Sequence, residues 1–300
     1  MLAQEGFEPQ LDEKNGSSAM DPIHDPIQLV FHDIDGCLNP ADGSPIGPAD
    51  QLSMSAGHKA VLARVNAAID ASTVEHVVIA TGRRLADTLF VTEHLPTKKL
   101  RYLLVESGAL AYDTVTEAYL DLQEIAVSSG VRHLCDLYSD LSQVHGVVAW
   151  YRAGGQAVLE ERLGSAVPEI PKEAMLTLRV CAAASEVAVM EELRQLLALE
   201  ESIDLNALNF YTNEARVDVT SRIDKATGAR IILAMLGVAP ERASMIGDGS
   251  NDLPVFELLG RGFCPSNAGD ALRRACVAAG GEALDHPFGE ASVKVFEGYA

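Results

Sequence analysis

The chain has 300 residues, of which 48% are hydrophobic and 22% charged, a composition that excludes disordered, collagen-like and disulfide-scaffold proteins. Its formal net charge of −20 would repel a phosphate backbone, which argues against nucleic acid as a partner. The length allows about two domains, or one domain that carries a large insert.

The lengths of the apolar runs and the spacing of the cysteines indicate the cellular setting of the protein. The longest apolar runs, such as residues 231–238, are far shorter than the roughly 20 residues that cross a bilayer. No basic and then apolar leader is present, so we expect no membrane contact. The five cysteines lie far apart without a C-x-x-C pair, which favours a reducing cytoplasm. We expect a monomer or a homodimer there.

The first half of the chain opens on a polar segment and then alternates strands with helices. Residues 1–26 lack periodicity and predict a disordered tail, with Met20 as a candidate true start. The apolar run 29–31, ending at Asp33, predicts a strand buried on both faces. A loop rich in glycine and proline follows at 39–49. The later elements predicted here are a helix through 61–69, a strand at 76–79, a helix at 85–95 and a strand at 102–105.

The end of the chain repeats this alternation, and the middle differs. We predict a helix at 225–236, a strand at 244–246, a helix at 253–259, a last strand at 262–264 and a helix at 268–279. Between the halves lie a strand at 176–180 with one exposed face, an amphipathic helix near 189–197, and a hairpin at 210–219 that leads back into the first domain. The pattern predicts an α/β protein with a doubly wound, Rossmann-like parallel sheet, split into 27–115 and 208–300 by an α/β insert at 116–207.

Two acidic clusters follow predicted strands, at the end of the sheet where α/β proteins bind ligands. Asp33 and Asp35 come directly after the first strand, and Gly36 permits a sharp turn. Asp248 and Asp252 follow the strand at 244–246 and suit a hard cation such as Mg²⁺. Taken singly, either cluster could be an ordinary surface turn or a calcium-type loop.

A third cluster, Thr81-Gly82-Arg83-Arg84, follows the strand at 76–79 and opens a helix. Its hydroxyl, amide and guanidinium groups suit an anion, although the cluster taken alone favours an ordinary helix N-cap. Lys225 starts the helix before the acidic loop at 248–252. Unrelated turns would have no reason to lie in order at the same end of one sheet, each with a complementary part of phosphoryl-transfer chemistry. The combination of the three clusters with Lys225 therefore favours a functional site.

These residues resemble the motifs of the haloacid dehalogenase-like phosphatase superfamily. Asp33-Ile34-Asp35-Gly36 is similar to its first motif, Thr81 to its second, Lys225 to its third, and Gly247-Asp248-Gly249-Ser250-Asn251-Asp252 to its fourth. An insert between the second motif and the lysine is typical of members with a large α/β cap. That subgroup includes sugar-phosphate phosphatases, phosphoglycolate phosphatases and phosphomannomutases.

The resemblance implies a role for each motif residue. Asp33 would attack phosphorus and Asp35 would act as general acid and then base, with Thr81 and Lys225 completing the catalytic set. Substrate oxygens would bind to Thr81, Gly82, Arg83, Lys225 and Asn251. The metal residues implied are Asp33, Asp35 (through its carbonyl), Asp248 and Asp252, the last of which would orient Lys225 or a metal-bound water.

Three positions need a separate interpretation. Cys37 stands where the motif usually carries threonine, and Ser107 where the segment after the third strand more often has asparagine. A buried packing thiol is the favoured interpretation of Cys37, with a redox role as the alternative. His32 adjoins Asp33, but side chains alternate along a strand, so we expect a core histidine and not a base.

The function predicted is a Mg²⁺-dependent hydrolysis of a small phosphate monoester, a sugar phosphate or a phosphorylated organic acid such as phosphoglycolate or a phosphoglycerate derivative. A phosphosugar mutase and a non-catalytic phospholigand-binding module are the alternatives. The partner is then a small phosphorylated metabolite.

Overall fold

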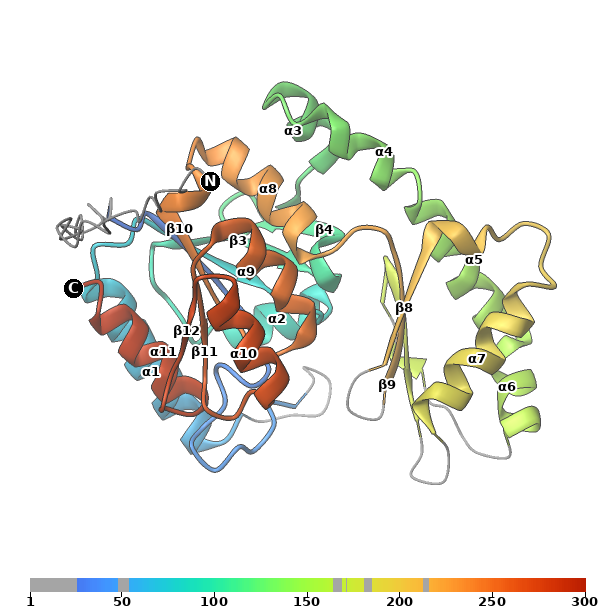
Figure 1. The fold of residues 1–300 in the computed structure, drawn as a ribbon, viewed down its shortest axis with the longest axis horizontal. Helices are drawn as coiled ribbons and strands as arrows, with labels where there is room; N and C mark the ends of the chain where they lie inside the picture. Colours follow the sequence, from blue (N-terminus) through green and yellow to red (C-terminus); the bar gives the residue numbers. More distant parts are fainter. Residues whose placement is uncertain (1–25, 48–53, 164–168, 171, 181–184, 213–215) are drawn as a thin grey trace, which may run out of the picture.

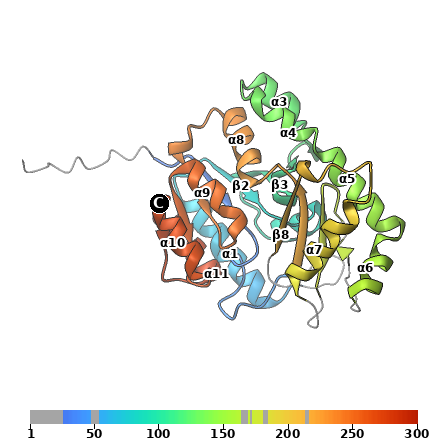
Figure 2. The same cartoon turned by 45° about the vertical axis from the view of Figure 1, so that its right-hand side comes forward.

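The computed structural model describes residues 26–47, 54–163, 169–170, 172–180, 185–212 and 216–300. The predicted tail, apart from Pro26, and the candidate start at Met20 lie outside the described residues, as does the end of the loop predicted at 39–49. Figures 1 and 2 show a larger unit built on one sheet and a smaller unit beside it. Within the described parts of the chain, no helix combines the length and apolar character that a bilayer crossing takes.

The larger unit is built on an eight-stranded sheet with the order β12-β11-β10-β1-β2-β3-β4-β5. Neighbouring strands from β12 to β3 run parallel, and only β4 and β5 pair antiparallel. Every residue of β1 and β10 is buried, as predicted for central parallel strands. The bounds are β1 Leu29–His32, β2 His76–Ala80, β3 Leu100–Val105, β4 Leu110–Asp113, β5 Ala118–Tyr119, β10 Ala243–Ile246, β11 Gly262–Cys264 and β12 Glu282–Ala283.

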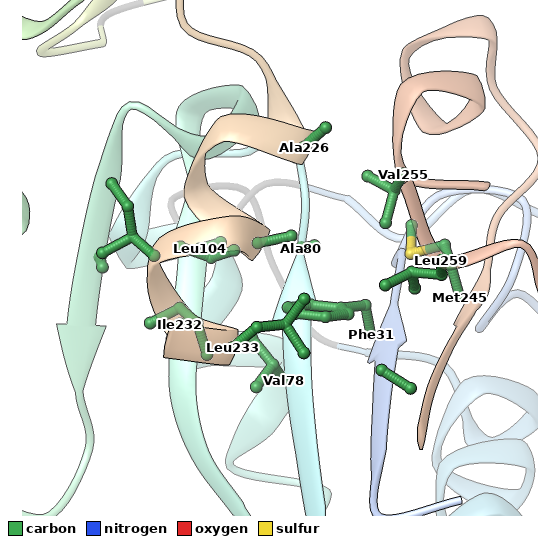
Figure 3. Close-up of a cluster of buried hydrophobic side chains, with 14 of the residues drawn as sticks. Phe31, Val78, Ala80, Leu104, Ala226, Ile232, Leu233, Met245, Val255 and Leu259 are labelled. Carbon is green, nitrogen blue, oxygen red and sulfur yellow. The ribbon is translucent and has the colours of Figure 1, made fainter. Parts of the chain in front are cut away.

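Helices cover both faces of this sheet. Side chains of β1 alternate between them, so that Phe31 packs with the α8 side and Val30 with the α1 side. Figure 3 shows Phe31 and Val78 packed beneath Leu233 of α8. On one face lie α8 Lys225–Leu236, α9 Leu253–Leu259, α10 Asp270–Ala278 and α3 Leu122–Ser128, and on the other α1 Ala56–Ala71, α2 Leu85–Thr92 and α11 Phe288–Glu297. The predicted doubly wound α/β core is confirmed.

The smaller unit is an antiparallel four-stranded sheet with the order β6-β7-β9-β8, covered on one side by three helices. Alternate strand residues such as Leu178, Val217 and Val219 pack beneath these helices. In Figure 1 the helices stand on the side of the sheet that faces away from the larger unit. The bounds are β6 Glu169–Ile170, β7 Met175–Arg179, β8 Leu208–Thr212, β9 Arg216–Ser221, α5 Leu141–Trp150, α6 Gln156–Leu163 and α7 Glu186–Leu197, with α4 Cys135–Tyr138 between α3 and α5.

The structure corrects four details of the prediction. The hairpin expected to lead back into the core is present as β8 and β9, but it pairs with β7, so residues 208–221 belong to the smaller sheet. Alternating side chains define a hairpin without saying which sheet it joins, and here Val217 and Val219 fill the space under α5 and α7. Conversely, β5 extends the larger sheet, and β12 follows the strand predicted to be the last. The strand predicted with one exposed face buries Thr177 as well.

Candidate active site

The first acidic residue, Asp33, follows β1 directly and is 6% exposed. Its Oδ1 accepts a hydrogen bond of 2.7 Å from the amide of Ile34, and its Oδ2 accepts one of 2.8 Å from Lys225 Nζ. Because β1 lies between β10 and β2, the loops that follow all three strands surround this carboxylate. Asp33 is thus fixed in one orientation at the centre of the sheet's carboxyl end.

Lys225 is fully buried at the first position of α8. Asp224 caps this helix, accepting a bond of 2.7 Å from the amide of Thr227, which sets where the helix begins. Lys225 Nζ donates to Asp33 and, at 2.6 Å, to Asp252 Oδ1. Burial alone would lower the pKa of the lysine, but the two carboxylates outweigh it and raise that pKa. The lysine is therefore a permanent cation.

Three carboxylates share this buried space. Ligand atoms of Asp33, Asp248 and Asp252 lie within 4.8 Å of one another. Burial, together with the charges of Asp33 and Asp252, raises the pKa of Asp248 to about 8. One lysine cannot neutralise three acids, so the donor set, hard oxygens with an excess of negative charge, fits a divalent cation such as Mg²⁺. The carboxylate of Asp35 lies outside this group, and both oxygens of Asp252 already accept bonds, from Lys225 and from the amide of Gly249.

Gly36 makes the close approach of the two acidic loops possible. Its φ is +70°, and a Cβ built on it would lie 1.7 Å from Oδ2 of Asp248. Its amide and carbonyl are held by Asn39, at 2.7 Å, and Asn267, at 3.0 Å. Only glycine satisfies both the left-handed backbone and the contact.

We expect Gly36→Ala to lower activity by at least about 100-fold, because the methyl group displaces Asp248. It also lowers the melting temperature by more than Gly237→Ala does. Gly237 is the matched control, since its φ is +67° but nothing lies within 4 Å of its Cβ position, which leaves backbone strain of roughly 1–2 kcal/mol as its only cost. Steady-state kinetics and thermal melts of both variants measure the difference. Equal effects of the two substitutions would contradict the proposed contact.

Asp35 is paired with an arginine that was predicted to bind substrate. Arg83 donates from Nε and Nη2 to the two carboxylate oxygens of Asp35, at 2.9 and 2.7 Å, and from Nη2 to the carbonyl of Ile46 at 2.6 Å. Burial raises the pKa of Asp35, but the hydrogen bonds and charge of Arg83 outweigh it and the pKa is lowered. Because the guanidinium already makes two hydrogen bonds to the Asp35 carboxylate, it does not face an open anion site, and the prediction that Arg83 binds substrate is not supported by its position.

The other predicted substrate-binding residues are placed differently from one another. Thr81 is buried, and its Oγ1 accepts a bond of 3.3 Å from the amide of Arg83. The carbonyl of Gly82 accepts a bond from Lys172 of the smaller unit. Asn251 is exposed in a short 3₁₀ turn next to the acidic loop. Thr81 and Gly82 therefore lie in the turn between β2 and α2, whereas Asn251 lies on the surface next to the acidic loop.

Sequence reasoning missed the residues that join the two units. Glu106 is 2% exposed and accepts hydrogen bonds from the amide of Glu173, at 3.0 Å, and from the amide of Ala174, at 2.5 Å. Glu106, Ser107 and Gly108 all have positive φ, and a Cβ on Gly108 would lie 2.5 Å from the carbonyl oxygen of Asp224. The sequence did contain a signal, the Glu-Ser-Gly run after β3. It could not identify the partners of Glu106, because these lie in the segment before β7, far along the chain.

The structure also answers the questions about His32 and Cys37. His32 Nε2 lies 2.9 Å from the hydroxyl of Ser292, and burial lowers the pKa of the ring to about 4. The ring is therefore a neutral core histidine, as predicted. Cys37 is fully buried, and burial followed by the charge of Asp248 raises the pKa of its thiol, which favours packing over redox chemistry.

A doubly wound sheet whose carboxyl end holds buried acids, one buried lysine and a hydroxyl-glycine turn is the arrangement that the sequence motifs predicted. The family model described as haloacid dehalogenase-like hydrolase matches residues 30–283. The chain belongs to this hydrolase family, as its motifs predicted.

The chain is also similar to individual proteins. It is 38% identical over 55 residues to a phosphoglycolate phosphatase of Methanopyrus kandleri and 44% identical over 57 residues to one of Natronomonas pharaonis, and these segments span 24% and 25% of the relatives. Among solved structures, it matches the Thermoplasma acidophilum protein 0175 with a TM-score of 0.60 at 15% identity, covering 92% of this chain and 99% of that one. It matches the Synechocystis sucrose-phosphatase, solved with sucrose and phosphate, with a TM-score of 0.59 at 14% identity, covering 91% and 98%. The structural matches establish the fold, and the family model establishes a haloacid dehalogenase-like hydrolase.

Proposed function

We propose that the protein is a Mg²⁺-dependent phosphatase that hydrolyses a small phosphate monoester through a phosphorylated Asp33. One observation carries the proposal: the buried carboxylate of Asp33 is held by the Ile34 amide and by Lys225. It stands beside Asp248, a carboxylate with which no cation among the described residues forms an ion pair. A stability role alone would not call for this arrangement, because several like charges in a buried space are costly to hold.

The reaction divides into two steps. An oxygen of Asp33 forms a bond to phosphorus as the ester P–O bond breaks, and Asp35 passes to the departing alkoxide a proton that it takes up from the monoanionic ester. Water then attacks the phosphorylated Asp33 and passes a proton back to Asp35, which releases inorganic phosphate and the free carboxylate. Arg83 acts as a positioning residue, because its two hydrogen bonds aim the Asp35 carboxylate and favour the ionised form that accepts this proton.

Other residues would hold the transferring group and the cation. Thr81, the Gly82 amide and Lys225 would bind the phosphoryl oxygens. Asp33, Asp248 and the Asp35 carbonyl would hold Mg²⁺, whereas Asp252 would orient Lys225. When bound, Mg²⁺ offsets the repulsion between the carboxylate and the phosphate. A reducing cytoplasm as the setting, and a small phosphorylated metabolite as the partner, belong to this proposal.

A panel of phosphate esters tests the proposed function. We expect phosphate release from several small esters with Mg²⁺, a fall of at least about 100-fold after removal of divalent cations with EDTA, and recovery when Mg²⁺ is restored. The measurement is free phosphate over time at fixed ionic strength. No release from any ester at any Mg²⁺ concentration would overturn the proposal and favour a binding module.

A further inference from the structure

The smaller sheet turns a polar face toward the larger unit. On β7 and β9, Leu178, Val217 and Val219 point into the smaller unit's own core. Because side chains alternate along strands, the intervening residues of β9 lie on the opposite face, which Figure 1 shows directed at the larger unit. That face carries Arg216 and Asp218, together with Thr177, whose hydroxyl donates to Asp218 at 2.5 Å.

Two cations of the smaller unit stand close to the general acid. Lys172 donates to the Gly82 carbonyl at 2.8 Å, which places its ammonium group against the turn that follows β2. Burial lowers the pKa of Lys172; the charges of Asp218 and Glu106 oppose this effect, and the charge of Arg216 adds to it. After burial and Arg83, the charge of Arg216 also contributes to the pKa of Asp35. Lys172 therefore lies at the Gly82 turn, and Arg216 lies on the face of β9 that is turned toward the larger unit.

Neither cation has a carboxylate partner within ion-pair distance among the residues that the structure describes. The remaining polar neighbour of the Lys172 ammonium is the sulfur of Met175, at 3.3 Å. Arg216 is half-buried. Asp218 and Glu106 are near enough for their charges to raise the pKa of Lys172, but neither forms an ion pair with it among the described residues. Both groups are thus available to an anion that enters from solvent.

A cavity adjoins this position. It has a volume of about 530 Å³ and lies between the start of α2 and helix α5, where it is lined by Arg84, Glu106, Val148 and Lys172, among others. This volume suits a small metabolite. Lys172 connects the cavity to the Gly82 turn, so the part of the ester beyond the phosphate would meet Lys172 first.

We propose that Lys172 and Arg216 recognise a second anionic group on the leaving part of the substrate, so that the enzyme prefers small phosphorylated acids over neutral phosphate esters. The inference rests on the proposed function, because it names the substrate class of the same site. A charge-assisted hydrogen bond to each cation distinguishes an anionic group from a hydroxyl, which cannot neutralise a half-buried charge.

The test compares esters of similar size that differ in charge. 2-Phosphoglycolate carries a carboxylate, 2-hydroxyethyl phosphate is its neutral counterpart, and O-phosphoethanolamine carries a cation. Fructose 1,6-bisphosphate, a larger ester, carries a second phosphate and so shows whether a phosphate can replace the carboxylate. We expect kcat/KM of the wild-type enzyme for 2-phosphoglycolate to exceed that for 2-hydroxyethyl phosphate by at least about 10-fold.

Three variants assign this preference to residues. Lys172→Met and Arg216→Met each lower kcat/KM for 2-phosphoglycolate by about 10- to 100-fold and leave 2-hydroxyethyl phosphate within about threefold of wild type. Arg216→Glu shifts the preference toward O-phosphoethanolamine. Arg230→Met is the matched control, since it removes one exposed cation from the middle of α8 and changes neither ratio.

Failure of this inference is distinguishable from failure of the proposed function. If the wild-type enzyme hydrolyses neutral and anionic esters equally, or if both Met variants slow all esters alike, the inference is overturned while the phosphatase stands. If no ester is hydrolysed, the proposed function itself fails.

Discussion

Replacing Asp33 by asparagine is expected to lower phosphate release by at least about 10³-fold while the protein stays folded. An amide oxygen is too weak a nucleophile to displace an alkoxide from phosphorus. The fold survives because Asn can still accept the hydrogen bond from the Ile34 amide, and because Lys225 keeps its bond of 2.6 Å to Asp252.

Two measurements check this result. Steady-state kinetics of Asp33→Asn are compared with those of Asp285→Asn, the same chemical change at an exposed position of the larger unit. Borohydride trapping of the reacting enzyme, followed by peptide mass spectrometry, should modify Asp33 in the wild type and in the control only. Near-wild-type turnover by Asp33→Asn would reject Asp33 as the nucleophile.

Lys225→Met is expected to remove both activity and much of the stability. The side chain is 0% exposed and bonds to Asp33 and Asp252, so its loss leaves two buried carboxylates without their cation. Removing one partner of a buried ion pair costs about 3–5 kcal/mol, which for a chain of this size lowers the melting temperature by roughly 5 °C or more.

A double variant separates the two losses. In Lys225→Met with Asp252→Asn, one of the unpaired charges is gone, so part of the lost melting temperature should return. Activity should not return, because the cation that faces the phosphoryl group is still missing. Recovery of turnover along with stability would show that Lys225 serves the fold alone. Thermal melts in the presence of EDTA keep metal binding out of the comparison.

The core and its acidic site were predictable because local patterns determine them. Short apolar runs became β1, β2 and β10, and parallel strands place the residues that follow them at one edge, which brought Asp33 and Asp248 together. The cap at Asp224 was enough to start α8 at Lys225. In such cases the signal and the structure it specifies lie within a few residues of each other.

Contacts between distant segments were beyond the sequence. The pairing of Arg83 with Asp35 depends on how the loop after β1 folds against the start of α2, and no spacing rule encodes it. The hydrogen bonds from the Glu173 and Ala174 amides to Glu106 could not be predicted either, because a backbone donor does not depend on which side chain the residue carries. The periodicity near 189–197 did predict α7, but the pairing of β8 and β9 with β7 follows from packing in three dimensions.

The position of β1 between β2 and β10 has a consequence for how the chain folds. β2 is the next strand along the chain after β1, but Lys225, which reaches Asp33 from α8, is 192 residues from Asp33 in the sequence. During synthesis, the edge of β1 that pairs with β10 stays unpaired until the smaller unit has been made. Forming such long-range contacts is the slow part of folding. Asp33 therefore gains its counter-charge only when α8 and β10 dock, so a nascent chain that stops short of them has no assembled site. Catalytic competence would arise at the end of folding, after the smaller unit is in place.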